Sequence, residues 1–233
     1  MRGLLNDLKE GDPATREQDE TEWGWAYNPL GVMGDLAAFP LKPVTQTMLC
    51  WMHTFLTDGT WNLEMFFLLI VLRRFIDIGD FVAFMSKAVF PKQLGNAAAF
   101  HCTAEEIQKM FNTGDHFKCS ASEGLSLYPL VAIFLQVFVV PRGVCQAQIA
   151  SYMAMARVLD LLSLSRFGLV TPEQLAIAIR QHMTLFVAAY DTFGVKPKFH
   201  YELHFPELLK RHGTLLGSEN ERIGMQSTKM QLI

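Results

Sequence analysis

The sequence predicts a predominantly α-helical protein. Apolar side chains recur every three or four positions between residues 61 and 74, which is the spacing of one helix face. At residues 171–174 the letters TPEQ combine an N-cap threonine, a proline at the first helical position and a capping glutamine. Half of the 233 residues are apolar, so the chain can bury a sizeable core.

Composition limits the classes of function. The formal charge is only -3, so contact with nucleic acid requires a local basic patch. Four cysteines without a secretory leader indicate reduced thiols or metal ligands, and predict a nuclear or cytoplasmic protein. The uncharged run 124–141 contains Pro129 and Gln136 and falls short of the roughly 18 apolar residues of a membrane span. We therefore expect no membrane, and keep a membrane-associated helical protein as the weakest alternative.

Three parts of the chain differ in composition and in hydrophobic pattern. Residues 1–22 mix acidic and basic side chains without an apolar period, which predicts a mobile charged arm. Residues 23–217 form the predicted helical domain, which begins with an irregular segment rich in Trp, Gly and Pro up to Pro43. Residues 218–233 have no period and predict an irregular tail.

Local signals place the helices. Capping residues are Thr103 with Glu106, Ser120 or Ser122, and Thr171. Pro129 is expected to kink the long apolar helix in which it lies, unless it falls near the first turn of that helix. The expected helical segments are 61–74, 80–90, a short helix after Thr103, a long one after Ser120 or Ser122, 149–168, 171–190 and 207–212. The expected core face of the 171–190 helix is Leu175, Ile179, Met183, Phe186, Val187 and Tyr190.

Two short motifs have metal-ligand spacing. Cys50 and His53 are three residues apart, and His200 and His204 are four apart, so each pair can face one ion from a single helical turn. Glu202 follows His200 by two positions, which disfavours a metalloprotease because that motif needs the glutamate next to the histidine. Each pair taken alone also fits ordinary buried or surface residues.

Other signals for a site are weaker. His101, Cys102, His116 and Cys119 form an alternative four-ligand set, but a helix must pass between the two halves and free structural side chains explain them better. Motifs of a serine hydrolase, of a phosphate-binding glycine loop and of a dinucleotide fold are missing from the sequence.

The order of the motifs resembles a known family. Asp35, then fourteen residues, then Cys50-x2-His53, a long helical stretch, Lys196 to His204, and finally Glu219 or Glu221 is similar to DDE transposases of the hAT, Kolobok and V(D)J-recombinase types. These have an RNase H-like core with a helical insertion, and the likeness spans residues 23–217. The resemblance implies a helical insertion-type domain with at most a short remnant of the sheet.

The resemblance also implies ligands and roles. Asp35 would be the second catalytic carboxylate and Glu219 or Glu221 the third, holding Mg²⁺ ions for phosphodiester chemistry. Cys50, His53, His200 and His204 would share one structural Zn²⁺. No counterpart of the first carboxylate precedes Asp35, so the chain is not expected to be an independent enzyme.

The expected function is that of a transposase-derived fragment or domesticated remnant, a zinc-clipped helical domain with residual binding of DNA or a partner. Lys196, Lys198, Lys210 and Arg211 are the candidate DNA contacts, although a solvated basic face explains them better. The main alternative is an α-helical interaction protein that uses helices at 61–90 as a groove for a protein partner or a second copy.

Overall fold

The computed structural model describes residues 49–88, 103–114 and 116–215. Of the residues that can be interpreted, 75% are helical and none is in a strand, which confirms the predicted all-α class. The predicted arm, the irregular N-terminal segment with Asp35, the pair His101 and Cys102, and the tail with Glu219 and Glu221 lie outside the described residues.

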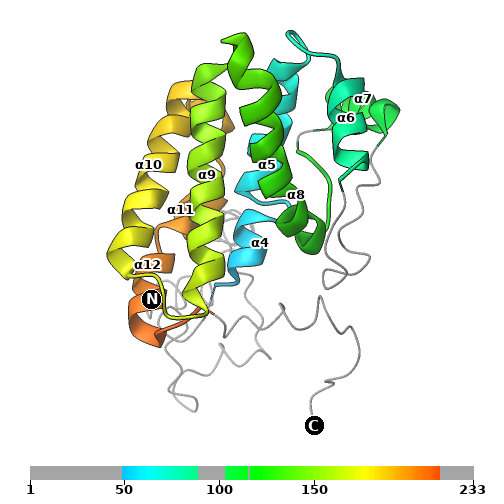
Figure 1. Ribbon diagram of the computed structural model, residues 1–233. Coiled ribbons are helices and arrows are strands. Elements are labelled where there is room, and N and C mark those ends of the chain that lie inside the picture. Colours follow the sequence, from blue (N-terminus) through cyan, green and yellow to red (C-terminus); the bar gives the residue numbers. More distant parts are fainter. Residues whose placement is uncertain (1–48, 89–102, 115, 216–233) are drawn as a thin grey trace, which may run out of the picture. The chain divides into compact units, whose positions relative to one another are not determined.

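The described elements follow one another along the chain (Figure 1). The α-helices are α4 (Trp51–Phe55), α5 (Thr60–Leu72), α6 (Ile78–Ser86), α7 (Ala104–Thr113), α8 (Ala121–Phe134), α9 (Gln146–Ser165), α10 (Pro172–Tyr190), α11 (Pro197–Glu202) and α12 (Phe205–His212). The shorter turns are the π-helical η3 (Leu135–Val139) and the 3-10 helices η4 (Val140–Arg142) and η5 (Thr192–Gly194).

Side-chain caps begin the helices where the sequence predicts them. The side chains of three cap residues, Thr103, Ser120 and Thr171, each accept a hydrogen bond from the backbone N–H three residues later. The side chain of that later residue in turn accepts a hydrogen bond from the backbone N–H of the cap. Ser120, and not Ser122, is therefore the cap of α8. Asp77 begins α6 through a bond from the Gly79 N–H at 2.8 Å.

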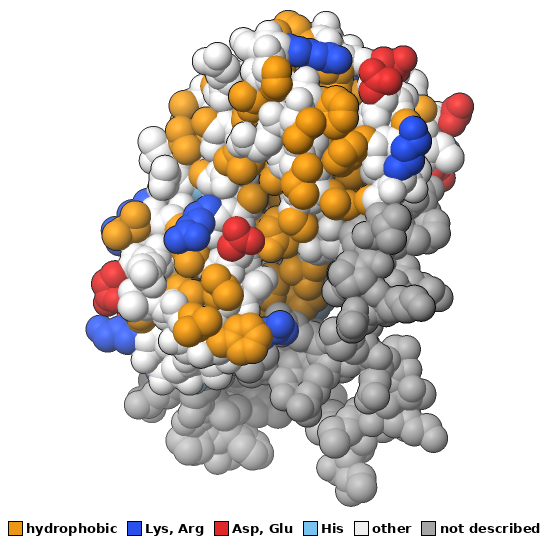
Figure 2. Space-filling model, in the orientation of Figure 1, with side chains coloured by type: hydrophobic (Ala, Val, Ile, Leu, Met, Phe, Trp, Pro, Cys, Tyr) orange, Lys and Arg blue, Asp and Glu red, His pale blue; other side chains and the backbone are white. Residues whose placement is uncertain are grey.

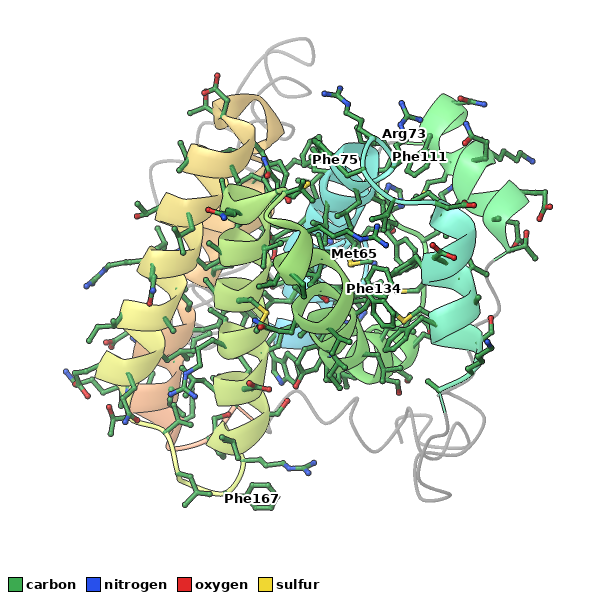
Figure 3. The ribbon with its side chains drawn as sticks, turned by 45° about the horizontal axis from the view of Figure 1, so that its top comes forward. Met65, Arg73, Phe75, Phe111, Phe134 and Phe167 are labelled. Carbon is green, nitrogen blue, oxygen red and sulfur yellow. The ribbon has the colours of Figure 1, made fainter. Side chains whose placement is uncertain are left out.

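The helices α9 and α10 form the largest helix–helix contact among the described residues. They lie side by side as a long antiparallel pair joined by a short turn that carries the exposed Phe167 (Figures 1 and 3). The helices α5 and α8 both pack against α9, and α12 packs against α10. The central helix α5 is buried on almost every side. A helix enclosed in this way lacks the polar face of a surface helix.

A hydrogen-bonded chain of large side chains joins three of these helices. Trp61 Nε1 on α5 donates to the Tyr152 hydroxyl on α9 at 3.1 Å. That hydroxyl in turn donates to the backbone oxygen of Tyr128 on α8 at 3.0 Å. All three groups lie in the core, where an unpaired polar atom is costly. The chain therefore fixes the rotation of α5, α8 and α9 relative to one another.

A second cluster of rings attaches the helices α6 and α7. The ring centre of Phe134 on α8 lies 5.2 Å from that of Phe81 and 5.3 Å from that of Phe84, both on α6. The Arg73 guanidinium, at the end of α5, lies 4.6 Å from the ring centre of Phe111 on α7 (Figure 3). These contacts have the geometry of aromatic and cation–π pairs.

Within the described residues, two helical stretches are long and apolar enough to cross a membrane. They are Trp51–Leu72 and Ala121–Arg142, and their most apolar windows are 72% and 44% buried inside the protein. The core helix of a soluble protein passes the same test, so the observation is weak evidence. The expectation of no membrane stays a prediction.

We predict that Tyr152→Phe lowers the free energy of unfolding by about 1–3 kcal/mol, because it leaves Trp61 Nε1 and the Tyr128 carbonyl without a partner in the core. Urea denaturation measures this change. Tyr201→Phe is the matched control, since Tyr201 is 38% exposed and should change stability by less than about 0.5 kcal/mol. Equal effects of the two substitutions would contradict the role given to the Tyr152 hydroxyl.

Candidate functional site

The two predicted ligand pairs are each assembled locally. Cys50 Sγ lies 3.0 Å from His53 Nδ1 at the start of α4. His200 Nε2, on α11, lies 3.2 Å from His204 Nε2, at the start of α12. Two nitrogen ligands on a tetrahedral zinc, each about 2.0–2.1 Å from the metal, are about 3.3 Å apart. The His200–His204 pair thus holds its nitrogens at nearly the separation that a shared metal ion requires, whereas the 3.0 Å between Cys50 Sγ and His53 Nδ1 is shorter than the roughly 3.6 Å between a zinc-bound sulfur and nitrogen.

The helices that carry the two pairs are neighbours. The Lys198 ammonium on α11 donates to the backbone oxygens of His53, Thr57 and Asp58, at 3.1, 2.7 and 2.9 Å. The rings of Phe55 and Phe205 also pack together, with centres 5.8 Å apart. The sequence stretches near residues 50 and 200 therefore fold back onto each other.

The pairs do not converge on one centre. Within the part of the chain that the structure describes, no three His, Cys, Asp or Glu side chains form a group arranged to hold a metal ion. His53, His200 and His204 are exposed, and Cys50 is half-buried. Two preformed pairs on adjacent helices are present, and a four-ligand centre stays a prediction.

The described half of the alternative cluster has other partners. His116 Nε2 lies 2.8 Å from the Asp58 carboxylate, at a pocket of about 200 Å³ between the start of α5 and Lys198. The Asn62 side-chain nitrogen lies 3.5 Å from Cys119 Sγ. Burial, together with the nearby Glu123 carboxylate, raises the pKa of the Cys119 thiol to about 12, so it is protonated and a poor metal ligand near neutral pH.

The predicted DNA contacts have structural partners. All three donors of the Lys198 ammonium bind backbone oxygens at the end of α4, where a cation is favourable. Arg211 pairs with Glu207 at 3.3 Å along α12. Lys210 is exposed on the last turn of α12, and Lys196 is exposed on the rim of the pocket near Asp58. DNA contact by the four cations stays a prediction.

The most unusual polar cluster was not predicted. Glu64 of α5, Ser151 of α9, His182 of α10 and Glu202 of α11 are all fully buried. His182 Nε2 lies 2.9 Å from a Glu64 oxygen, and the Ser151 hydroxyl donates to the other Glu64 oxygen at 2.6 Å. His182 Nδ1 lies 3.8 Å from Glu202 Oε2.

Electrostatics decides the charge of this cluster. Burial alone would lower the pKa of His182, but the charges and hydrogen bonds of Glu64 and Glu202 outweigh it and raise this pKa to about 10. Burial raises the pKa of Glu202, and His182 opposes that rise. His182 is therefore a buried imidazolium between two carboxyl groups.

The expected core face of α10 is partly wrong. Val187, expected on that face, is 40% exposed, whereas His182 occupies it. Ser151 of α9 is fully buried and bonded to Glu64. A polar residue in a helical pattern is normally assigned to solvent, so only the acidic and basic types of Glu64, His182 and Glu202 could have suggested a pairing.

The predicted partner groove at residues 61–90 begins with the buried helix α5. Binding of a partner by this segment stays a prediction. Exposed apolar side chains also gather over α8 and the turns after it (Figure 2). They are Ile133, Val137, Phe138 and Val140, with exposed fractions of 42–57%.

Comparison with known proteins adds no relative. A scan against protein-family models finds no match, and searches of curated proteins and of solved structures find none either.

We predict that His182→Gln lowers the free energy of unfolding at pH 6 by about 3–5 kcal/mol, because it leaves buried carboxylates without their cation. The His182 pKa is raised from 6.5 to about 10 on folding. The stability from its charge is therefore fully present below about pH 6.5 and is lost as pH rises through about 10.

Chemical denaturation from pH 6 to 10.5 measures the gap between wild type and His182→Gln, which should narrow toward high pH. The exposed His212→Gln variant is the control and should show a small gap that does not follow this trend. A gap for His182→Gln that is constant across the range would contradict a charged His182.

Proposed function

We propose that this chain is a helical domain of a transposase-derived protein in which one zinc ion clips α4 to α11 and α12. The observation that carries the proposal is the pair of preformed donor sets on adjacent helices, Cys50 with His53 and His200 with His204. Lys198 supports it, because its bonds to the end of α4 hold these two parts of the chain together.

Zinc would serve a structural purpose here. One thiolate and three imidazoles suit a closed tetrahedral site, which leaves no open position for a substrate. Rotation of exposed histidine side chains about χ1 and χ2 is the motion that would bring the second pair toward the first. The binding free energy would then add to the stability of the contact between α4 and α11.

Catalysis by the chain alone is not part of the proposal. Asp35, Glu219 and Glu221 are the carboxylates that the family resemblance assigns, and two-metal phosphoryl transfer requires a complete set. The resemblance supplies two positions of the three. We propose residual binding of DNA or a protein partner in the nucleus or cytoplasm as the remaining activity.

We predict that the purified chain binds one equivalent of Zn²⁺, and that Co²⁺ in its place gives the visible absorption of a tetrahedral thiolate site. Cys50→Ser and His204→Gln should each abolish stoichiometric binding, because three ligands do not close the site. Cys145→Ser and His212→Gln are the matched controls, since neither belongs to the donor pairs. Metal content that is absent, or unchanged by Cys50→Ser, would refute the clasp.

We predict that DNA binding, if retained, depends on salt through Lys196, Lys210 and Arg211. Each substitution by alanine should reduce the slope of log K against log salt by about one, because each removes one phosphate contact. Lys87→Ala is the control, because Lys87 lies at the end of α6 and does not belong to the candidate DNA contacts. A wild-type affinity that does not change between 50 and 200 mM salt (roughly the range in which phosphate contacts are screened) would exclude this activity.

The second candidate is an α-helical interaction protein without a nucleic-acid role. The exposed apolar side chains over α8 and η3 favour it, since a surface of this kind commonly marks a binding site. Metal analysis separates the candidates: stoichiometric zinc favours the clasp, and its absence favours the interaction protein.

A further inference from the structure

The segment from Phe199 to Phe205 has an inward and an outward set of side chains. Phe199, Glu202 and Phe205 are buried at every third position, while His200 and His204 are exposed between them. The outward histidines can therefore keep a fixed direction only if the three inward residues are held.

Two of the inward residues are held by rings. Phe199 stacks on the His182 ring with centres 6.1 Å apart and planes inclined by 13°, and it lies 4.7 Å from Phe186. Phe205 packs on Phe55 of α4. Ring packing is strong but not very directional, and a six-residue helix such as α11 has little stability of its own.

Glu202 supplies a charged contact. It is fully buried, and neither of its carboxyl oxygens has a hydrogen-bond partner of good geometry. Its Oε2 lies 3.8 Å from Nδ1 of the His182 imidazolium, a nitrogen that also has no hydrogen-bond partner, so the two groups form a buried ion pair. His182 is itself oriented by the 2.9 Å contact of its other ring nitrogen with Glu64. Glu64 is held by Ser151. A line of contacts thus runs from α9 through α5 and α10 to α11.

Each helix around His182 carries a carboxyl group or a phenol close to the cluster. Glu64 lies on α5 and Glu202 on α11, while the buried phenols of Tyr152 on α9 and Tyr190 on α10 stand near Glu64 with raised pKa values. Neither phenol is ionised near neutral pH. The two carboxyl groups are therefore the only acidic groups of this set that can pair with the imidazolium.

We propose that the contact between Glu202 and His182 is the positioning element of the outward histidine pair: it sets the rotation of α11 and so aims His200 and His204 along the surface next to α4. Glu202 acts through α11 and is not a metal ligand. Its effect on zinc affinity rests on the proposed function, whereas its effect on the order of α11 does not.

The test compares Glu202→Gln with wild type. Glutamine keeps the size of the side chain and removes its charge, so helical content by circular dichroism should be retained. In metal-free protein, hydrogen exchange of the amides of residues 199–205 should be faster by about tenfold or more in the variant. Glu207→Gln, an exposed glutamate on α12, is the matched control and should exchange like wild type.

A double-mutant cycle shows whether the two residues act together. The variant with both Glu202→Gln and His182→Gln should exchange no faster in this segment than the more affected single variant, because the contact can be lost only once. If Glu202→Gln does not fold, Glu202→Asp replaces it; the shorter side chain lengthens a 3.8 Å contact and predicts the same order of effects. Unchanged exchange in the segment, or additive effects in the cycle, would overturn the proposal.

Metal titration separates this inference from the proposed function. In metal-free protein titrated with Co²⁺, Glu202→Gln should weaken the affinity by about tenfold and leave the absorption band of the four ligands in place. Wild-type protein that binds no Co²⁺ while Glu202→Gln still speeds exchange would refute the clasp and support the positioning role. If wild-type protein binds Co²⁺ and Glu202→Gln changes neither the Co²⁺ affinity nor the hydrogen exchange, the clasp is supported and the positioning role of Glu202 is refuted.

Discussion

A single buried carboxylate organises the interior of this protein. Glu64 lies in the middle of α5, where nearly every other side chain is apolar, and it binds Ser151 of α9 and His182 of α10. A charge in such a place is tolerated only when it is paired and hydrogen-bonded, so the helices around it cannot rotate or slide independently. Glu64 thus ties α5 to both α9 and α10.

The same constraint reaches the surface. The His182 ring lies between Glu64 in the core and Glu202 on α11. Lys198, on the same short helix as Glu202, donates to the backbone at the end of α4. Helix α11 therefore has an acidic contact facing inward and a basic contact facing α4. His200 lies on the same helix and His204 at the start of α12, and the neighbouring helix α4 carries a thiol and a third exposed histidine at its start. The interior chemistry and the proposed metal clasp are thus parts of one arrangement.

Other polar residues are explained by the fold without a catalytic role. Lys198 uses its three donors on backbone oxygens, and Cys119 is a buried thiol whose raised pKa keeps it protonated. The apolar surface over α8 and η3 is a separate feature with no titratable group in it.

Much of the helical structure was set by the sequence alone. The starts of α7, α8 and α10 were predictable because a cap is made between residues three apart, and the closeness of each donor pair was predictable because its two residues are only three or four positions apart in the chain. The burial of Ser151 and His182, the exposure of Val187 and the engagement of Lys198 were not. They depend on which helix lies opposite, across separations of 87 to 145 residues, and a polar side chain changes from solvent-facing to core only when a distant partner satisfies it.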